Sequence, residues 1–328
     1  MKKIQLCLFI LAFTTWNANA QEDFAPINTG AANFLTLSTD AQSAAMGGVS
    51  VALPESNNAI FFNAASSIIN SKTAGVSYSF APVMRDFESG HSLNSLGGFY
   101  KIDKRNVILA GFRYYHYPKV EGITDGDNTN KTIRPKEWAI DLGYAREIIS
   151  NLGVSATVRL IHSDMGNIGG AKSANAVAFD IGAIYKSNFQ FMNGASWTAG
   201  LQLSNFGTKI KYMNTNEDLP AFIKAGGSVD VSFTPIHRLM VTADLGYRMM
   251  PSDIRSLGVS AGAEYTLMDI FKARGGYHYG DKKKGDTSYT TAGLGICHCG
   301  AQLDFAWLFA EKESPLKNSF WLTVGYSF

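Results

Sequence analysis

The chain has 328 residues, of which 46% are hydrophobic and 17% charged, and its formal net charge is +2. This length fits one large domain or two small ones, and the small net charge gives no reason to expect a nucleic acid or another polyanion as a partner. Phe (21), Tyr (14) and Gly (32) are abundant, which favours β-sheet over helix, because aromatic side chains suit a pleated surface and glycine suits turns and crowded interiors.

Residues 1–20 have the pattern of a secretory signal peptide. A short basic start is followed by an almost wholly apolar stretch at 4–13 and by the small-x-small sequence "ANA" at 18–20. This order predicts cleavage before Gln21, so the mature chain is expected to be exported.

Residues 21–73 follow no strand pattern and are rich in Ala, Ser and Asn. The run Ser38-Thr39-Asp40 can cap a short helix that runs through Ala45, and Gly47-Gly48 would stop it. Because some fifty residues are more than a tether needs, we expect this segment to fold as a plug inside the barrel that the later strands predict. Packing below the rim of that barrel is the alternative.

From residue 74 onward, apolar and polar residues alternate with a period of two in fourteen segments. Most segments are near ten residues, the length that a tilted strand needs to cross the hydrocarbon layer. The expected strands are 74–80, 92–101, 106–116, 136–147, 152–163, 175–187, 195–204, 223–233, 237–248, 257–266, 270–279, 289–297, 300–310 and 319–328.

The connections between these strands are alternately short and long, and 117–135 and 205–222 are among the longest. Tight periplasmic turns and longer outer loops are typical of outer-membrane barrels. The sequence therefore predicts an all-β fold, a transmembrane antiparallel β-barrel over 74–328 in a Gram-negative outer membrane. Membrane lipid and lipopolysaccharide would surround it, and its last strand would end on the periplasmic rim at Phe328, where assembly machinery reads terminal aromatic residues.

The alternation also assigns the faces of each strand. In 237–248, Val241 and Leu245 would face lipid, while Met240, Thr242 and Asp244 would face the lumen. Aromatic residues near the outer strand ends are expected to form a girdle at the membrane surface. They are Tyr114, Tyr117, Tyr247, Trp307 and Phe320.

The same parity places nine charged residues in the lumen. Because both signs occur, we expect paired networks that hold the interior together, since unpaired buried charges are costly. A selectivity filter for ions is the alternative, but the sequence shows no ring of charged residues that all have the same sign. The residues are Asp141, Arg159, Asp180, Lys224, Asp230, Asp244, Arg248, Glu264 and Asp304.

Catalytic and metal-binding patterns are weak, and we predict no enzyme, no cofactor and no metal site. The sequence His162-Ser163-Asp164 contains the residue types of a hydrolase triad, but adjacent residues on one strand cannot converge. The "DGDN" sequence at 125–128 lacks the remaining ligands of a calcium loop. The outer rim also carries His91, His116 and His278.

Cys297 and Cys299 are the only cysteines after the predicted signal peptide. A disulfide or a metal half-site with His298 is conceivable for them, but two small apolar residues at a strand end is the preferred interpretation.

The segment 37–68, "LSTDAQSAAMGGVSVALPESNNAIFFNAASSI", carries a recognisable signature. It resembles the N-terminal signature of the FadL-related barrels, and more closely that of the PorV/PorQ group of the type IX secretion system. The segments 100–115, 134–148, 203–212 and 219–229 are similar to PorV in the same order. The matching signature residues are Asp40, Ala41, Met46, Gly47, Asn63 and Ala65.

This resemblance implies a fourteen-stranded barrel with the plug positions Asp40, Met46, Gly47 and Asn63 as binding residues. It also implies a shuttle that binds the C-terminal signal domain of secreted cargo and passes it to a sortase-like attachment complex, with the outer loops 117–135 and 205–222 as contact surface. The alternative is FadL-like passive transport of a hydrophobic small molecule past the plug and through a lateral gap. Three glycines in neighbouring strands fit either such a gap or simple curvature. They are Gly97, Gly98 and Gly111.

Overall fold

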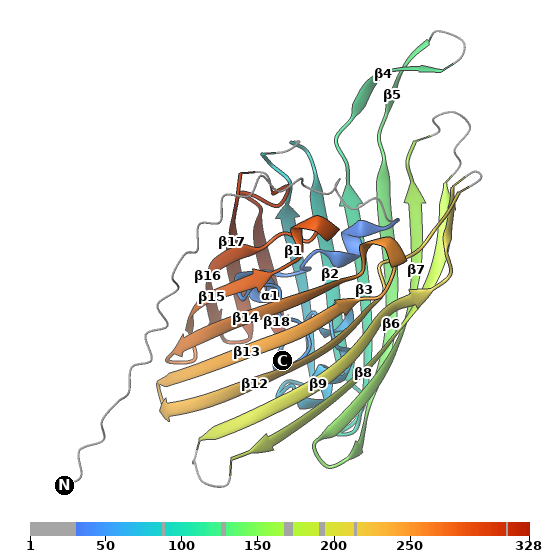
Figure 1. The fold of residues 1–328 in the computed structure, drawn as a ribbon. Coiled ribbons are helices and arrows are strands. Elements are labelled where there is room, and N and C mark those ends of the chain that lie inside the picture. Colours follow the sequence, from blue (N-terminus) through green and yellow to red (C-terminus); the bar gives the residue numbers. More distant parts are fainter. Residues whose placement is uncertain are drawn as a thin grey trace, which may run out of the picture.

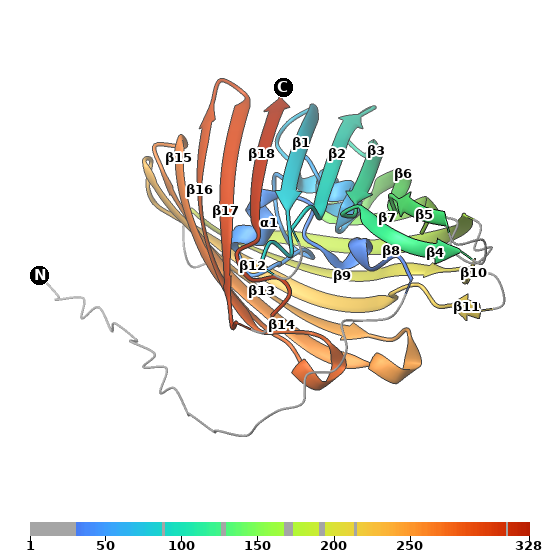
Figure 2. The same ribbon diagram turned by 90° about the horizontal axis from the view of Figure 1, so that it is seen from above.

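Fourteen strands form a closed antiparallel barrel in the computed structural model (Figures 1 and 2). The structure describes residues 31–86, 89–125, 129–166, 173–189, 194–212, 215–312 and 314–328, so the predicted signal peptide 1–20 lies outside the described residues. Strand β1 (Ala74–Pro82) pairs with β18 (Phe320–Ser327), and this pairing closes the barrel.

The other twelve barrel strands follow in chain order around the wall. All fourteen strands were predicted to within three residues at each end, and three of them with the observed bounds. The twelve are β2 (Ser92–Lys101), β3 (Asn106–His116), β6 (Lys136–Ile149), β7 (Leu152–Asp164), β8 (Ala174–Asn188), β9 (Ala195–Gly207), β12 (Phe222–Thr234), β13 (His237–Arg248), β14 (Ser256–Leu267), β15 (Phe271–Tyr279), β16 (Tyr289–His298) and β17 (Ala301–Ala310).

Two further hairpins lie in connections that the sequence analysis treated as loops. Strands β4 (Val120–Asp125) and β5 (Thr129–Ile133) pair only with each other, and Figure 1 shows them extending beyond the ends of the barrel strands. Strands β10 (Ile210–Tyr212) and β11 (Thr215–Glu217) form a second small sheet. These short strands do not line the lipid layer, so the alternation on which the prediction depends does not mark them. Both hairpins lie on one rim, which we call the long-loop rim.

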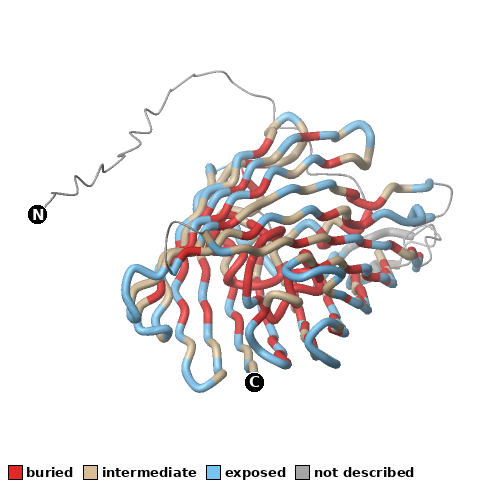
Figure 3. Tube along the Cα trace, turned by 90° about the horizontal axis from the view of Figure 1, so that it is seen from below, coloured by how far each residue is buried: buried red, intermediate tan, exposed pale blue. Residues whose placement is uncertain are grey.

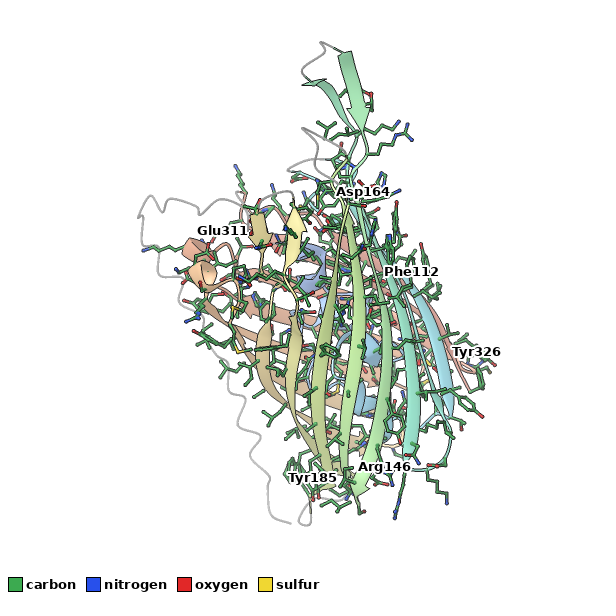
Figure 4. All side chains as sticks on the ribbon, turned by 90° about the vertical axis from the view of Figure 1, so that its right-hand side faces the viewer. Phe112, Arg146, Asp164, Tyr185, Glu311 and Tyr326 are labelled. Carbon is green, nitrogen blue, oxygen red and sulfur yellow. The ribbon has the colours of Figure 1, made fainter. Side chains whose placement is uncertain are left out.

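The predicted faces are confirmed. In β13, Val241 and Leu245 are about half exposed, whereas Met240 and Thr242 are buried. Figure 4 shows Phe112 pointing outward from the wall, as the apolar belt requires. The girdle prediction is wrong for Tyr117, which follows the end of β3 and packs over the lumen, where its hydroxyl donates a hydrogen bond to Glu137 Oε2 at 2.7 Å.

Residues 31–73 lie inside the barrel as the plug (Figure 3). They contain one α-helix, α1 (Ala41–Ala45), and the short 3-10 helices Asn33–Thr36, Ala59–Phe61 and Ala64–Ile69. Two more 3-10 turns, Ser252–Ile254 and Lys282–Lys284, lie in connections at the long-loop rim. None of the described helices is long and apolar enough to cross a membrane.

Three cross-strand pairs of glycines receive the bulky residues of the plug. Gly262 and Gly276 are paired across β14 and β15, and a Cβ at Gly262 would lie 2.5 Å from Met46 Cβ. The pairs Gly97–Gly111 and Gly200–Gly226 face Phe61 and Val51 in the same way. A side chain at these positions would displace the plug, so Gly97 and Gly111 serve close approach of the plug rather than a gap.

Candidate functional site

The signature residues at the start of the plug hold α1 against the wall. The Asp40 carboxylate accepts hydrogen bonds from Ser43 N at 2.8 Å and from Asn58 Nδ2 at 3.1 Å, which caps the helix and ties it to a distant part of the plug. The Met46 side chain is fully buried. Gly47 has φ +75°, and a Cβ there would lie 2.5 Å from the Tyr277 carbonyl oxygen, so only glycine fits.

Asn63 and Asp244 fasten the middle of the plug. Asn63 Nδ2 donates to the carbonyl oxygens of Val51 in the plug and Ala183 in β8, both at 3.0 Å. Asp244 Oδ2 accepts hydrogen bonds from the backbone nitrogens of Ser50 at 2.5 Å and Val51 at 2.9 Å. The predicted binding positions therefore contact the barrel wall and the plug's own backbone.

Burial raises the pKa of Asp40 to about 6, more than the hydrogen bonds from Ser43 and Asn58 lower it. The folded plug thus binds this proton more tightly than an unfolded plug does, so Asp40 lowers stability increasingly as pH rises from about 4 to about 6. We expect Asp40→Asn to be more stable than the native chain by up to about 3 kcal/mol above pH 6, with a smaller difference at pH 4. Asparagine also caps helices, so the cap is retained, and the Asn58 amide can turn over so that its Oδ1 accepts from the new side-chain amide.

Urea unfolding of both proteins in detergent between pH 4 and pH 7 measures this difference. A stability difference that stays constant across that range would show that Asp40 does not carry the proton.

One buried ion network joins β3, β6, β7 and β8. Asp141 lies between two arginines, with Arg113 Nη2 at 3.2 Å and Arg159 Nε at 2.5 Å from its Oδ1. Arg159 Nη2 also pairs with Asp180 Oδ2 at 2.7 Å, and its Nη1 bonds the side chain of Asn205. Asn205 has φ +59° and lies at a bulge between β8 and β9, where its backbone nitrogen donates to Asp180 Oδ1 at 2.6 Å.

A second network lies across β14, β15 and β17. Arg274 pairs with Glu264 Oε2 and Asp304 Oδ1, both at 2.6 Å, and Lys272 adds a contact to Glu264 at 3.4 Å. Asp230 lies near the rim opposite the long-loop rim, which we call the short-turn rim, and pairs with Arg238 at 2.7 Å. The expected pairing of lumen charges is therefore seen for most of the predicted residues.

A cavity of about 870 Å³ lies between the plug and the long-loop half of the wall. Plug residues 33–38 form part of it, and β3, β17 and β18 contribute an apolar side. The opposite side comes from β12 and β13 and carries the cations Lys224 and Arg248. The apolar side includes Phe34, Leu37, Tyr115, Leu308, Leu316 and Trp321.

Lys224 and Arg248 differ from the other lumen cations, because neither forms an ion pair with a carboxylate of the described residues. Arg248 is only 6% exposed, and its Nε and Nη1 atoms are buried without a hydrogen-bond partner in the described part of the chain. Lys224 Nζ donates one hydrogen bond, to Ser50 Oγ at 3.2 Å. Both cations lie over the Phe222 ring, at 5.6 Å for Lys224 and 5.1 Å for Arg248.

His278 also lines this cavity, between Ser260 Oγ at 2.9 Å from its Nδ1 and Asp286 Oδ1 at 3.1 Å from its Nε2. In serine hydrolases the serine bonds Nε2 and the carboxylate bonds Nδ1, so the order here is reversed. The arrangement fixes Asp286 at the edge of the cavity. In the sequence His162-Ser163-Asp164, the His162 side chain forms its hydrogen bond with Asn175 rather than with Ser163 or Asp164.

Cys297 and Cys299 lie apart from the cavity, whereas His91 lines it. Cys297 and Cys299 are both free thiols at the short-turn rim, and the described residues contain no group of three side chains arranged to hold a metal ion. In the turn 281–286, Lys282 pairs with Glu311 and Lys284 donates to the Asp253 carbonyl oxygen at 3.0 Å, so these two lysines contact the protein itself.

Sequence reasoning missed Arg113, Arg274 and Phe222. Arg113 has the same parity as Gly111 and Tyr115 on the inner face of β3, and Arg274 lies directly opposite Glu264. The alternation along β3 and β15 could therefore have assigned both arginines to the lumen. Phe222 is the first residue of β12, where the alternation has too few residues to assign a face.

A comparison with known protein families matches residues 19–255, more than half of the chain, to the type IX secretion system protein PorV. The chain belongs to the PorV family. As a member of this family with a closed barrel fold, it is an integral outer-membrane protein of type IX secretion.

Solved structures share the fold of this PorV-family barrel. The toluene transporter TbuX of Ralstonia pickettii has a TM-score of 0.59 at 15% identity, covering 90% of this chain and 99% of that chain. The toluene transporter TodX of P. putida has a TM-score of 0.62 at 13% identity, covering 89% and 98%. A FadL homologue of Pseudomonas aeruginosa has a TM-score of 0.51 at 12% identity, covering 94% and 100%. At these identities the likeness concerns the fold alone.

A comparison with curated proteins gave no match. The family is that of a type IX secretion protein, and the fold is a closed β-barrel.

Proposed function

We propose that this PorV-family barrel binds the C-terminal signal domain of secreted cargo at the cell surface and hands it to a sortase-like attachment complex. Membership of the PorV family is the observation that carries this proposal. The plug supports it, because residues 31–73 lie in the lumen and the cavity of about 870 Å³ beside them is too small for a folded domain to pass. The long-loop rim then offers the contact surface.

The hairpin β4–β5 supplies the most prominent part of that surface (Figure 1). It pairs with no barrel strand, so its removal leaves the register between His116 in β3 and Lys136 in β6 unchanged. Deleting residues 120–133 leaves 117–119 and 134–135 as the connection, which is long enough for a hairpin loop.

We expect the native barrel, purified from its own outer membrane in mild detergent, to carry secreted proteins that share a C-terminal domain, together with a sortase-like partner. Mass spectrometry identifies them. The variant without residues 120–133 should recover several-fold less cargo at equal barrel yield. As a matched control, Asp103→Ser alters the opposite rim, where the Asp103 carboxylate holds the turn to Asn106. A native barrel that carries no secreted protein would contradict the proposal.

Passive transport of a hydrophobic small molecule is the second candidate function. The cavity with its apolar side from β3, β17 and β18 is the observation that favours it. Organic extraction of the same purified barrel, followed by mass spectrometry of the extract, separates the two candidates. A bound hydrophobic compound in the absence of cargo would favour transport.

A further inference from the structure

We propose that the cavity beside the plug receives the C-terminal end of the cargo polypeptide, with its terminal carboxylate held by Lys224 and Arg248. This inference rests on the proposed function, and it names the part of the cargo that enters the barrel.

Arg248 lacks the partner that the other buried arginines of the lumen have among the described residues. The other arginines of the lumen that are as deeply buried as Arg248 have carboxylates beside them: Arg113 and Arg159 share Asp141, and Arg274 lies between Glu264 and Asp304. Arg248 has the same burial without such a partner among the described residues. A buried guanidinium without an anion is costly, so the site is complementary to an anionic group that comes from outside the chain.

The geometry favours a single planar anion. The register of β12 and β13 places Phe222 directly opposite Arg248, with Lys224 two residues further along β12. The Phe222 ring lies beneath both cations and limits how they can turn. A guanidinium presents two parallel N–H donors to a carboxylate, and an ammonium adds a third donor.

The neighbouring carboxylates limit the charge of the ligand. Asp244 faces the same cavity but is engaged by the plug backbone at Ser50 and Val51, and Asp286 is engaged by His278. In formal charge these two groups balance the two cations, so a ligand with one negative charge suits the site better than a ligand with two. A chain-terminal carboxylate carries one charge.

The size and the walls of the cavity fit a short segment of extended chain. A volume of about 870 Å³ is within the range of pockets that enclose a drug-sized ligand, which excludes a folded domain but admits a few residues. Apolar side chains of the segment would lie against Phe34, Leu308 and Trp321 across the cavity from the cations. The cavity lies in the long-loop half of the barrel, on the side where cargo is proposed to bind.

Photo-crosslinking in the native host tests the inference. Leu316 lines the cavity and is replaced by p-benzoylphenylalanine, and the crosslinked peptides are mapped by mass spectrometry. Leu294, which is 66% exposed on the lipid face of β16, is replaced in the same way as a position control. We expect crosslinks from position 316 to include the last residues of secreted proteins, and position 294 to give none of them.

Charge variants are then combined with the crosslinker at 316. Lys224→Met with Arg248→Met should lower the yield of C-terminal crosslinks about tenfold or more, because the carboxylate loses both partners. Arg248→Lys keeps the charge but loses the paired donors, so its yield should lie between those of the native barrel and the double variant. Lys209→Met removes a cation at the same rim, from an exposed pair with Asp218, and should leave the yield unchanged. Folding of each variant is checked by its migration on unheated gels.

The outcomes separate this inference from the proposed function. Cargo that co-purifies but crosslinks through internal segments, or not at all, overturns the inference and leaves the proposed function standing. Absence of cargo from every preparation overturns both. A free organic acid crosslinked at 316 in place of cargo overturns the assignment to a chain terminus. The crosslink map of the otherwise native barrel decides these cases even where a charge variant fails to fold.

Discussion

Replacing Asp141 by alanine is expected to destabilise the folded barrel by about 3–5 kcal/mol, because it leaves Arg113 and Arg159 buried without their shared carboxylate. The Asp141 side chain has no exposed area, so its removal takes a fully buried counter-charge from the two guanidinium groups. Among the described residues, Arg159 keeps Asp180, whereas Arg113 keeps its position over the rings of Phe34 and Phe61. The change should therefore loosen the plug as well as the wall.

The midpoint of urea unfolding in detergent, followed by the band shift of the folded barrel on unheated gels, measures this loss. Lys209→Met is the matched control, since it removes an exposed ion pair with Asp218 at 2.9 Å. The loss of this pair should lower the free energy of unfolding by less than about 1 kcal/mol. Equal midpoints for Asp141→Ala and the native barrel would mean that the network does not hold the wall together.

Gly276→Val should have an effect of similar size through shape rather than charge. A side chain at this position overlaps the backbone of Met46 and Gly47, which cannot move away as a flexible side chain can. The cost is expected to exceed the roughly 1–3 kcal/mol of an ordinary overpacked core position, because the whole segment around α1 must leave the wall. Protease treatment of the intact barrel should then cut the plug near residue 46.

The neighbouring residue provides the control. Gly275 lies on the lipid face of the same strand, and a Cβ there would meet only the Thr291 carbonyl oxygen at 3.8 Å. Gly275→Val should therefore leave the plug protected and the yield of folded barrel unchanged. If both valine variants behave alike, the effect belongs to β-strand propensity or assembly and not to the plug.

The wall could be predicted from the sequence because lipid and lumen impose opposite polarity on alternate residues. That constraint reaches from Leu239 to Arg248 in β13 and likewise along the other barrel strands, so their bounds and faces follow from the alternation. The direct cross-strand pairs Asp141–Arg159 and Glu264–Arg274 also follow once neighbouring strands are aligned.

The cavity could not be predicted in this way. Its shape depends on the path of residues 31–73 through the lumen, which no periodic pattern describes, and on which inward charges remain unpaired. Arg248 and Arg274 are both arginines that face the lumen. Only the three-dimensional arrangement shows that Arg274 pairs with two carboxylates and that Arg248 pairs with none of the described residues. The hairpin β4–β5 was missed because neither of its strands crosses the membrane.

The three cross-strand glycine pairs have a consequence for how this chain can evolve. Each pair is a recess matched to one residue of the plug, Met46, Val51 or Phe61, although the two partners lie far apart in the sequence. A mutation that enlarges one member must be accompanied by a smaller residue in the other. Plug and wall are therefore inherited as a matched set, and exchanging plugs between relatives should succeed only when the glycine recesses are exchanged with them.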